Sequence, residues 1–395
     1  MSRVSDLPQP LDTLVVSLTS PCNLACTYCQ TEPYIRPLKR RMSMSLLKKT
    51  ITEAISYASG RGQSKLEFCF CGGEPLLAGM KCFESIVEIQ KQHQSSGLEV
   101  FNTVQTNGTL IDKDWARFFK KNHFGVSVSL DGPDVIQNRQ RPKHNGKGSF
   151  AAIMSGLDAL GSQSIPYGLL AVITEDTASE AASIMPFLLS LEPHLVDFLP
   201  CAERGSVVTS DSFGEFLVQA FDIWIDSKVN PNSIPVKTFR DLCLQISGIH
   251  ISKRCDYFGE CTRTPIVTPD GVVAVCDQYV GKEAGLLGNI SGNSGEAVFN
   301  SERTQRFREF SATVPDGCSE CDYLDLCRGG CTQRRSGKDG IDYLCSARIR
   351  LFAHVSEKLI TILDPVARTE LKEDGRGVIT FTNQGVKENG RSLPS

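Results

Sequence analysis

Cysteine residues constrain this sequence more than any other feature, because they form two groups that can hold metal in different ways. The chain has 395 residues, of which sixteen are cysteines. Three of them, Cys22, Cys26 and Cys29, can bind three irons of a four-iron cubane and leave the fourth iron open to a non-protein ligand. Eight thiolates can fill two further cubanes, so the pattern indicates redox chemistry. The eight in the last third are Cys255, Cys261, Cys276, Cys318, Cys321, Cys327, Cys331 and Cys345.

The composition describes a globular chain with nearly balanced charge. Its 41% hydrophobic residues suffice for a sizeable core, and its length suggests two or three domains. Lys and Arg number 42 against 45 Asp and Glu, which gives no electrostatic argument for binding nucleic acid or an anionic membrane. The N-terminus has no apolar signal segment, and no stretch is apolar enough to span a bilayer. We therefore expect a cytoplasmic protein, in which clustered cysteines indicate metal or catalysis before disulfides.

Short apolar runs alternate with longer amphipathic stretches in the first half of the chain. Helical spacing is seen, for example, at 43–59 and 80–94. Six β-then-α units predict parallel strands joined by right-handed crossovers, and six fall short of the eight that close a full barrel. The expected fold is therefore α/β, a partial (β/α)6 TIM-like barrel. The predicted strands are 11–18, 66–71, 100–105, 125–130, 167–173 and 196–200.

The predicted domains follow from these patterns. The partial barrel should cover 11–235 and include an amphipathic linker helix at 211–228. A cysteine-rich domain should follow over 236–363, in which the pattern loosens into short strands and turns before a final helix at 347–363. The polar, Gly-rich residues 364–395 are expected to be a flexible tail.

Four motifs directly follow the first four predicted strands. They are the first cysteine group, the segment Cys71-Gly72-Gly73-Glu74-Pro75, the segment 105–108 (QTNG) and the segment 129–133 (SLDGP). The carboxyl ends of parallel strands meet on one rim of a barrel, where the active sites of such folds lie. We therefore expect the four motifs to lie together.

The first cysteine group has the spacing C-x3-C-x2-C, which lets one loop place three thiolates around a corner of a cubane. Structural zinc is the alternative, but it takes four ligands, and no further Cys or His follows until Cys69. With this spacing after the first strand of an α/β series, the chain resembles the radical S-adenosylmethionine (SAM) enzymes. The resemblance implies a [4Fe-4S] cluster whose open iron binds SAM.

The same resemblance implies which residues bind the cofactor. Gly72, Gly73 and Glu74 would meet the methionine amino group, through backbone carbonyls and the Glu carboxylate. Ser129 would contact the ribose and Arg141 the cofactor carboxylate, although a turn serine and a solvated arginine are equally open interpretations. Tyr28, between the second and third cysteines, is the last residue of the predicted cofactor-binding set.

The second cysteine group resembles, gap for gap, the SPASM extension of peptide- and protein-modifying radical enzymes. Its core is the run C-x2-C-x5-C-x3-C from Cys318 to Cys331. The resemblance implies two auxiliary [4Fe-4S] clusters, fully ligated by protein and suited to electron transfer or structure. A pair of zinc sites is the alternative. One cluster would be held by Cys255, Cys261, Cys276 and Cys331, and the other by Cys318, Cys321, Cys327 and Cys345.

Within this class the chain is most similar to the anaerobic sulfatase-maturating enzymes, through the stretches 72–79, 105–115, 128–133, 275–280 and 287–290. Members oxidise a Cys or Ser of a sulfatase to Cα-formylglycine. A radical takes a Cβ hydrogen, a base removes the thiol or hydroxyl proton, and an electron passes to an auxiliary cluster. The resemblance implies that Asp277 is the catalytic base; a solvated loop aspartate is the alternative. It also implies a sulfatase as substrate and a reductant such as flavodoxin or ferredoxin.

Three features depart from the family pattern. Cys71 stands where members usually carry Gln, Gln30 stands where they often carry an aromatic residue, and the tail has no counterpart. A maturase that cross-links side chains of a ribosomal precursor peptide would use the same residues, so it stays an alternative. A non-catalytic iron–sulfur electron carrier is a more distant one, because a carrier needs neither an open cluster nor the Gly72–Glu74 motif.

Overall fold

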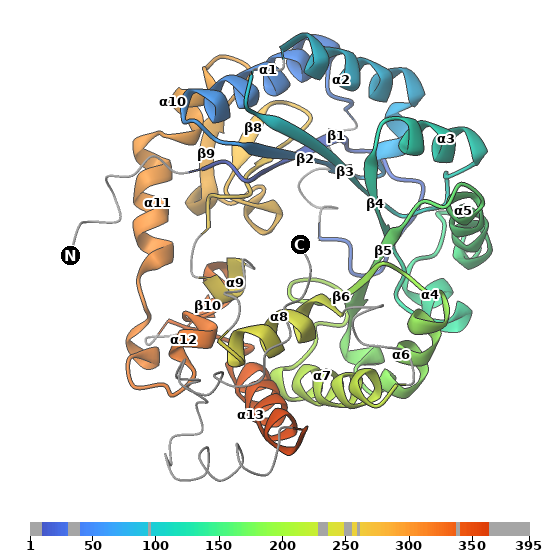
Figure 1. The fold of residues 1–395 in the computed structure, drawn as a ribbon, viewed down its shortest axis with the longest axis vertical. Helices are drawn as coiled ribbons and strands as arrows, with labels where there is room; N and C mark the ends of the chain where they lie inside the picture. The colour runs from blue at the N-terminus through green and yellow to red at the C-terminus, as the bar shows by residue number, and fades with distance from the viewer. Residues whose placement is uncertain are drawn as a thin grey trace, which may run out of the picture.

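Six parallel strands, each followed by one or two helices, form an arc with the helices on its outer side (Figure 1). The structure is a computed structural model that describes residues 10–30, 40–93, 96–227, 236–248, 255–258, 261–336 and 340–362. The strands are β1 Thr13–Thr19, β2 Lys65–Gly72, β3 Glu99–Thr106, β4 Phe124–Ser129, β5 Tyr167–Ile173 and β6 Leu195–Pro200. The helices are α1 Met44–Gly60, α2 Met80–His93, α3 Lys113–Lys121, α4 Asp134–Gln140, α5 Phe150–Ser162, α6 Ala181–Ser190 and α7 Ser210–Ile225.

The predicted partial barrel is confirmed. Each of the six strands pairs in parallel with its sequence neighbour, so β1 and β6 stand at opposite ends of the arc. The strand limits differ from the predicted ones by at most two residues. Helix α1 begins one residue later than predicted, because Ser43 caps it by accepting a hydrogen bond from the Leu46 N–H. The predicted end of α2 at residue 94 lies outside the described residues, as does the tail 364–395.

The C-terminal region adds three strands to the same sheet. Its order is β6-β5-β4-β3-β2-β1-β7-β8-β9, with β7 parallel to β1 and the last two strands antiparallel. Strands of two to four residues carry almost no periodicity, so the sequence did not predict this continuation. The C-terminal elements are β7 Ile266–Val267, β8 Val272–Ala274, β9 Leu286–Asn289, β10 Arg335–Ser336, β11 Ile341–Asp342, α8 Lys237–Ile246, α9 Cys255–Phe258, α10 Gly295–Phe299, α11 Glu302–Ala312, α12 Leu324–Cys327 and α13 Cys345–Ile362.

The expectation of short strands and turns before the final helix is wrong for α8, α10 and α11. Helix α11 is eleven residues long and is capped by Ser301, but it buries few apolar side chains, Phe307 among them. Its sequence therefore shows no clear apolar stripe. The final helix α13 begins at Cys345, two residues before the predicted start, and packs against α7 and α8 (Figure 1). No helix among the described residues is long and apolar enough to cross a membrane.

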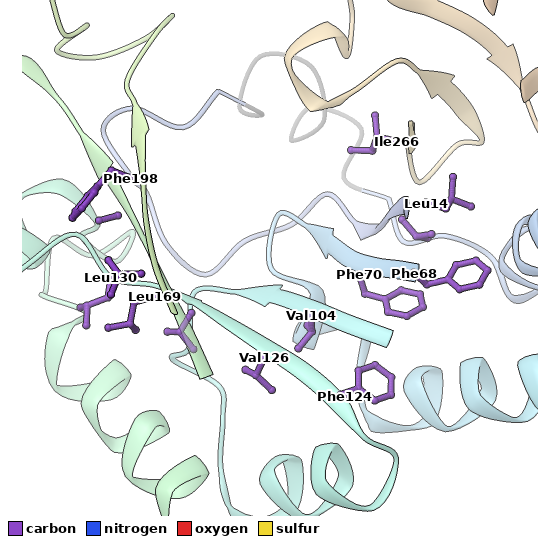
Figure 2. Packing of buried hydrophobic residues seen from close by; sticks show 14 of the residues in the cluster. Leu14, Phe68, Phe70, Val104, Phe124, Val126, Leu130, Leu169, Phe198 and Ile266 are labelled. Atoms are coloured by element: carbon purple, nitrogen blue, oxygen red, sulfur yellow. The ribbon is translucent and has the colours of Figure 1, made fainter. Parts of the chain in front are cut away.

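The hydrophobic core lies between the arc of strands and the surrounding helices. Figure 2 shows Phe68, Phe70 and Phe124 among the side chains that fill this layer. Phe70 meets Phe83 of α2 at a ring-centroid distance of 5.9 Å, and Phe83 meets Trp115 of α3 at 5.1 Å. Each fully buried aromatic side chain contributes about 1.5–3 kcal/mol, so this layer holds the helices on the outer face of the arc.

The inner face of β2 is more polar than its outer face. Along β2, Phe68 and Phe70 are fully buried on the outer face, whereas Glu67, Cys69 and Cys71 alternate with them and are partly accessible. Strands buried on both faces are apolar throughout, so this alternation indicates that helices cover only the outer face of β2. Glu67 accepts hydrogen bonds from the hydroxyls of Thr13 at 3.3 Å and Thr103 at 2.7 Å on the two neighbouring strands.

Candidate active site and cluster-binding residues

The first cysteine group lies in the loop that leaves β1 at the carboxyl rim of the arc. The loop is held by backbone hydrogen bonds from Ala25 and Thr27 to the carbonyls of Pro142 and Gln140. It contains all three cysteines in partly buried positions. Burial raises the pKa of Cys26 to about 12, and the neighbouring Cys22 and Cys29 contribute to the rise.

The donor set of this loop fits iron. A thiol with so high a pKa stays protonated unless a cation takes the place of its proton, and iron binds thiolates with release of that proton. The three sulfurs belong to one loop of the chain, with Cys26 close enough to the other two for their charges to act on it. Cys22, Cys26 and Cys29 would therefore hold the cluster that leaves one iron open.

Hydrogen bonds join the four rim motifs to one another, which confirms their predicted convergence. Asn107 of the QTNG segment donates to the Asn23 side chain at 2.8 Å and to the Cys22 sulfur at 3.8 Å. Its backbone N–H donates to Glu74 at 2.8 Å. In the same segment, Gln105 donates to the hydroxyl of Ser129 at 3.1 Å. The QTNG segment thus connects the cysteine loop, the glycine motif and the end of β4.

Gly72 and Gly73 are required by the close approach of two strand ends. A Cβ at Gly72 would overlap with the Thr19 carbonyl, and one at Gly73 with the carbonyls of Ser20 and Pro21. Gly72 also has φ of +146°, a conformation that other residues rarely adopt. The two glycines therefore let β2 end directly against the chain that enters the cysteine loop.

Glu74 is fully buried and already binds several donors. Its carboxylate accepts from the Thr106 hydroxyl at 2.7 Å, the Asn107 N–H at 2.8 Å and the Leu76 N–H at 3.1 Å. Burial raises the pKa of Glu74 to about 7, and these hydrogen bonds oppose the rise. A carboxylate can accept about four hydrogen bonds, so one position stays open for an ammonium group of a ligand.

Two hydroxyls on the rim fit a bound polar molecule. The Oγ of Ser17 and the Oγ1 of Thr19 are buried, and neither has a hydrogen-bond partner within the part of the chain that the structure describes. A Cβ at the neighbouring Gly72 would stand 3.3 Å from the Ser17 Oγ, which places this hydroxyl beside the glycine motif. Buried polar atoms are rarely left unpaired, so a polar ligand such as SAM suits this end of β1.

Arg141 and Tyr28 meet at a carboxylate that the sequence analysis did not single out. Asp131 is fully buried and receives Arg141 through Nε at 2.9 Å and Nη2 at 3.0 Å. It also accepts from the Tyr28 hydroxyl at 2.5 Å and the Val172 N–H at 3.0 Å. Arg141 is thus held in a bidentate pair rather than solvated, and its Nη1 lies outside that pair. Asp131 could have been found from its place in the SLDGP motif.

The thiols of the second cysteine group gather in two sets of four. Burial raises the pKa of Cys276, and Asp277, Cys255, Cys331 and Cys261 add to the rise, which places the first set around Cys276. Burial also raises the pKa of Cys345, with contributions from Cys327, Cys318 and Cys321 in the second set. These are the sets that the SPASM resemblance implies; their role as cluster ligands stays a prediction.

The second set lines one hollow. The empty space of this hollow, counted out to the solvent at its mouth, is about 290 Å³. Among the described residues, no three or more His, Cys, Asp or Glu side chains are arranged to hold a single metal ion. Four thiols around one apolar-walled space are a donor set suited to a [4Fe-4S] cluster. The lining residues are Cys318, Cys321, Tyr323, Leu324, Cys327, Gly329, Cys345, Arg348, Ile349 and Phe352.

Asp277 stands between the two cysteine regions. It follows Cys276 and accepts hydrogen bonds from the Gln278 N–H at 3.0 Å and from Nε2 of Gln30 at 2.8 Å. The Asp277 side chain is exposed to solvent. Many protein groups nevertheless lie around its carboxylate, and its charge acts on Cys71 on the inner face of β2. This desolvation raises the pKa of Asp277, and the hydrogen bonds from Gln278 and Gln30 oppose the rise. The contact with Gln30 was missed by the sequence analysis, which noted that residue only as a departure.

The fold and the site together define a class of protein. A partial barrel with a three-thiol loop on its rim, followed by a region with eight further cysteines, is a radical SAM enzyme with a SPASM domain. Residues 16–188 match the Radical SAM superfamily, and residues 255–322 match the iron-sulfur cluster-binding domain called SPASM. The SAM and iron–sulfur cofactors expected from the sequence are confirmed by these matches.

Relatives narrow the class further. The chain is 30% identical to the cysteine-type anaerobic sulfatase-maturating enzyme of Clostridium perfringens strain 13, over 90% of this chain and 99% of the relative. It is 28% identical to the serine-type enzyme of Bacteroides thetaiotaomicron, over 88% of this chain and 90% of the relative. The chain belongs to the anaerobic sulfatase-maturating enzyme family.

Solved structures agree with this assignment. The structure of anSMEcpe with bound AdoMet and the Cp18Cys peptide matches with a TM-score of 0.80 and 29% identity, over 91% of this chain and all of that one. Streptococcus suis SuiB, bound to its precursor peptide SuiA, matches with a TM-score of 0.63 but 13% identity, over 86% of this chain and 76% of that one. The second likeness is one of fold alone.

Proposed function

We propose that this chain oxidises a Cys or Ser side chain of a sulfatase to Cα-formylglycine, with Asp277 as the base. The observation that carries the proposal is the position of Asp277, on the rim between the first cysteine loop and the first set of C-terminal thiols. Membership of the sulfatase-maturating family supports the choice of substrate. The chain's contact with a peptide is supported by the peptide present in anSMEcpe.

Separate residues of the rim would bind the cofactor and transfer the proton. When bound at the Cys22 loop, the cluster and SAM supply a radical that can take a hydrogen atom from an unactivated Cβ. Glu74 and the carbonyls of Gly72 and Gly73 would hold the methionine ammonium, and Ser129 would contact the ribose. Arg141 would offer its remaining N–H groups to the cofactor carboxylate while Asp131 keeps it in place.

Asp277 would take the proton of the substrate thiol or hydroxyl. Its raised pKa makes it a stronger base than an ordinary aspartate, because the desolvation that raises the pKa also favours taking up a proton. The substrate loses one hydrogen atom, one proton and one electron in total. Ser thereby gives the aldehyde directly, whereas Cys gives a thioaldehyde, which water converts to the aldehyde with release of H2S. The electron would leave toward the set around Cys276, which is adjacent to the base in the sequence.

The cluster count and the reductant are parts of the same proposal. Eleven cysteines would hold three [4Fe-4S] clusters, three of them at the SAM-binding cluster and four at each auxiliary cluster. Reconstituted protein should therefore contain about twelve irons per chain, and about four would refute the auxiliary-cluster assignment. Flavodoxin or ferredoxin is the proposed electron donor.

The reaction is tested by anaerobic assay of the reconstituted chain and its Asp277→Asn variant. A sulfatase-motif peptide and a cross-linkable precursor peptide are incubated in parallel reactions with SAM and reductant. Mass spectrometry then measures the mass of each product. The wild-type chain should convert the first peptide to formylglycine. The variant should still cleave SAM but form less than about a hundredth of the product, as loss of a general base typically costs 10²–10⁴-fold.

A matched variant and the second peptide decide between the alternatives. Asp114→Asn removes an aspartate on the exposed surface of α3 and should leave product formation unchanged. Unchanged product from Asp277→Asn would remove Asp277 as the base. Loss of two hydrogens from the precursor peptide, with all side-chain atoms retained and no reaction of the sulfatase peptide, would instead assign the chain to peptide cross-linking.

A further inference from the structure

Two arginines and two aspartates form a buried ion-pair network in the C-terminal region, outside the residues used so far. Arg348 pairs with Asp342 at 2.8 Å, and Arg334 pairs with the same carboxylate at 3.2 Å. Both arginines also reach Asp256, at 3.6 and 3.4 Å. The side chains of Arg348 and Asp342 are only 6% and 2% exposed, so the network lies in the protein interior.

The network connects the two sets of thiols. At one end, the Asp342 carboxylate accepts a hydrogen bond of 2.9 Å from the backbone N–H of Cys331, a member of the first set. At the other end, Nη1 of Arg348 donates to the sulfur of Cys327, a member of the second set, at 3.8 Å. This distance is within the range for a sulfur acceptor. A series of hydrogen bonds and an ion pair therefore connects Cys331 through Asp342 and Arg348 to Cys327.

Arg348 also lines the hollow of the second set. Among the described residues that line this hollow, it is the one charged side chain beside four thiols and apolar groups such as Phe352 and Ile349. The guanidinium thus faces the space that a cluster would occupy. Its charge is maintained, because the arginine side chain does not lose its proton in proteins.

The energetics of the network point to a role other than stability. Buried ion pairs lose so much hydration that apolar replacements of similar volume are often as stable or more stable. The loop between Cys327 and Cys331 is nevertheless shaped around this pair. A Cβ at Gly330, whose φ is +71°, would overlap with Arg348 Nη1 and lie 2.5 Å from the Asp342 carboxylate.

We propose that Arg348 raises the reduction potential of the cluster bound by Cys318, Cys321, Cys327 and Cys345. Hydrogen bonds to ligand sulfurs and nearby positive charge favour the reduced cluster, which carries one more negative charge. Asp342 fixes the guanidinium against Cys327, and Arg334 balances the charge of that carboxylate. The proposal rests on the proposed cluster ligands and is independent of which peptide the enzyme oxidises.

The experiment is a redox titration of the full-length, reconstituted chain, in which electron paramagnetic resonance measures the reduced clusters at each potential. Arg348→Gln should retain the wild-type iron content and shift the midpoint potential of one auxiliary cluster to a more negative value, with the other clusters unchanged. A Cys318→Ala, Cys345→Ala double variant assigns the signal, because it should lack that cluster. Arg350→Gln is the matched control: Arg350 lies on the same helix, exposed and paired with Glu215 at 2.9 Å, and should cause no shift.

A second variant decides the outcome if Arg348→Gln fails to retain its iron. Arg348→Lys keeps the charge balance of the network with a shorter side chain that lacks the planar fork, so it should hold the cluster at a more negative potential than wild type. Iron-replete variants in which every cluster keeps its wild-type potential would overturn the proposal. A shift that appears equally in Arg350→Gln would overturn it as well.

Discussion

At the scale of single residues, two carboxylates organise this site, and their hydrogen-bond partners explain which positions matter. Asp131 binds Arg141 and Tyr28 at once, so the charge of Arg141 is neutralised on the rim before any ligand arrives. Asp277 is held by Gln30 from the cysteine loop. The charge of the same aspartate raises the pKa of Cys71 on β2, although burial is the larger cause. Gln30, which departs from the family pattern, therefore contacts Asp277 directly, and Cys71 lies within range of its charge.

The contact of Gln30 with Asp277 leads to a prediction about coupling. Gln30→Met keeps the approximate shape of the side chain but removes a hydrogen bond to a charged group, which contributes about 1.5–3 kcal/mol. We expect peptide oxidation to slow about tenfold or more while SAM cleavage continues, so that more SAM is consumed per product. The measurement is the ratio of 5′-deoxyadenosine to oxidised peptide.

The control for this prediction is Gln219→Met on the outer surface of α7, where the exposed side chain donates a hydrogen bond to Glu215 of the same helix. It should leave the ratio at the wild-type value. A wild-type ratio in Gln30→Met would show that the hydrogen bond does not position Asp277.

At the scale of elements, Glu74 ties the end of β2 to the end of β3. Its carboxylate accepts from Thr106 and Asn107, and the fully buried position raises its pKa to about 7 from the ordinary 4.5. The unfolded chain therefore loses this proton at lower pH than the folded chain does. Stability from this group is present below pH 4.5, declines as the pH rises from 4.5 to 7, and is lost above 7.

This linkage predicts a specific pH dependence. The decline should amount to about 3 kcal/mol across that interval, and Glu74→Gln should remove it, because the amide does not titrate. The measurement is the apparent unfolding midpoint of the cluster-loaded protein at fixed scan rate from pH 4.5 to 7, without SAM. Saturating SAM should flatten the decline if its ammonium meets Glu74. Parallel curves for the variant and the wild type would contradict the prediction.

Elements differ in how far the sequence predicts them. The six barrel strands were located within two residues, because apolar residues alternate with polar ones or turn signals on a scale of a few residues. Strands β7 to β9 and helix α11 were not, since strands of two to four residues and a mostly polar helix leave no periodic signal. Their pairing with β1 and packing on the barrel depend on residues far away in the sequence.

At the scale of the whole molecule, several contacts join the C-terminal region to the barrel, and two of them place the cysteines. Strand β7 pairs with the edge strand β1, which brings the turn at Asp277 to the rim. Helix α13 packs against α7 at a point of close approach. A Cβ at Gly214 of α7 would stand 2.9 Å from the Cα of Ala347. This contact fixes the last helix, whose first residue is Cys345, against the barrel.

The close approach of the two helices predicts the effect of one added methyl group. Gly214→Ala should lower stability by about 1–3 kcal/mol, as overpacking does in a well-packed interface. Gly161→Ala in α5 is the matched control, because its Cβ would have no atom within 4 Å and a helical alanine is more stable than glycine by up to ~1 kcal/mol. The measurement is the unfolding midpoint of each variant. Equal shifts in both would show that the helices do not pack at Gly214.

The first cysteine group indicated the reaction class through its resemblance to the radical SAM enzymes, and the alternation of strands and helices predicted the barrel, because both signals depend on residues near one another in the chain. The SPASM resemblance implied two sets of four thiols, and the structure brings the same sets together. Three interactions became known only from the fold. They are the hydrogen bond from Gln30 to Asp277, the ion pair between Arg141 and Asp131, and the ion-pair network between Cys331 and Cys327. Each joins residues from separate loops or elements, and a hydrogen bond or ion pair depends on where the folded backbone places its two partners.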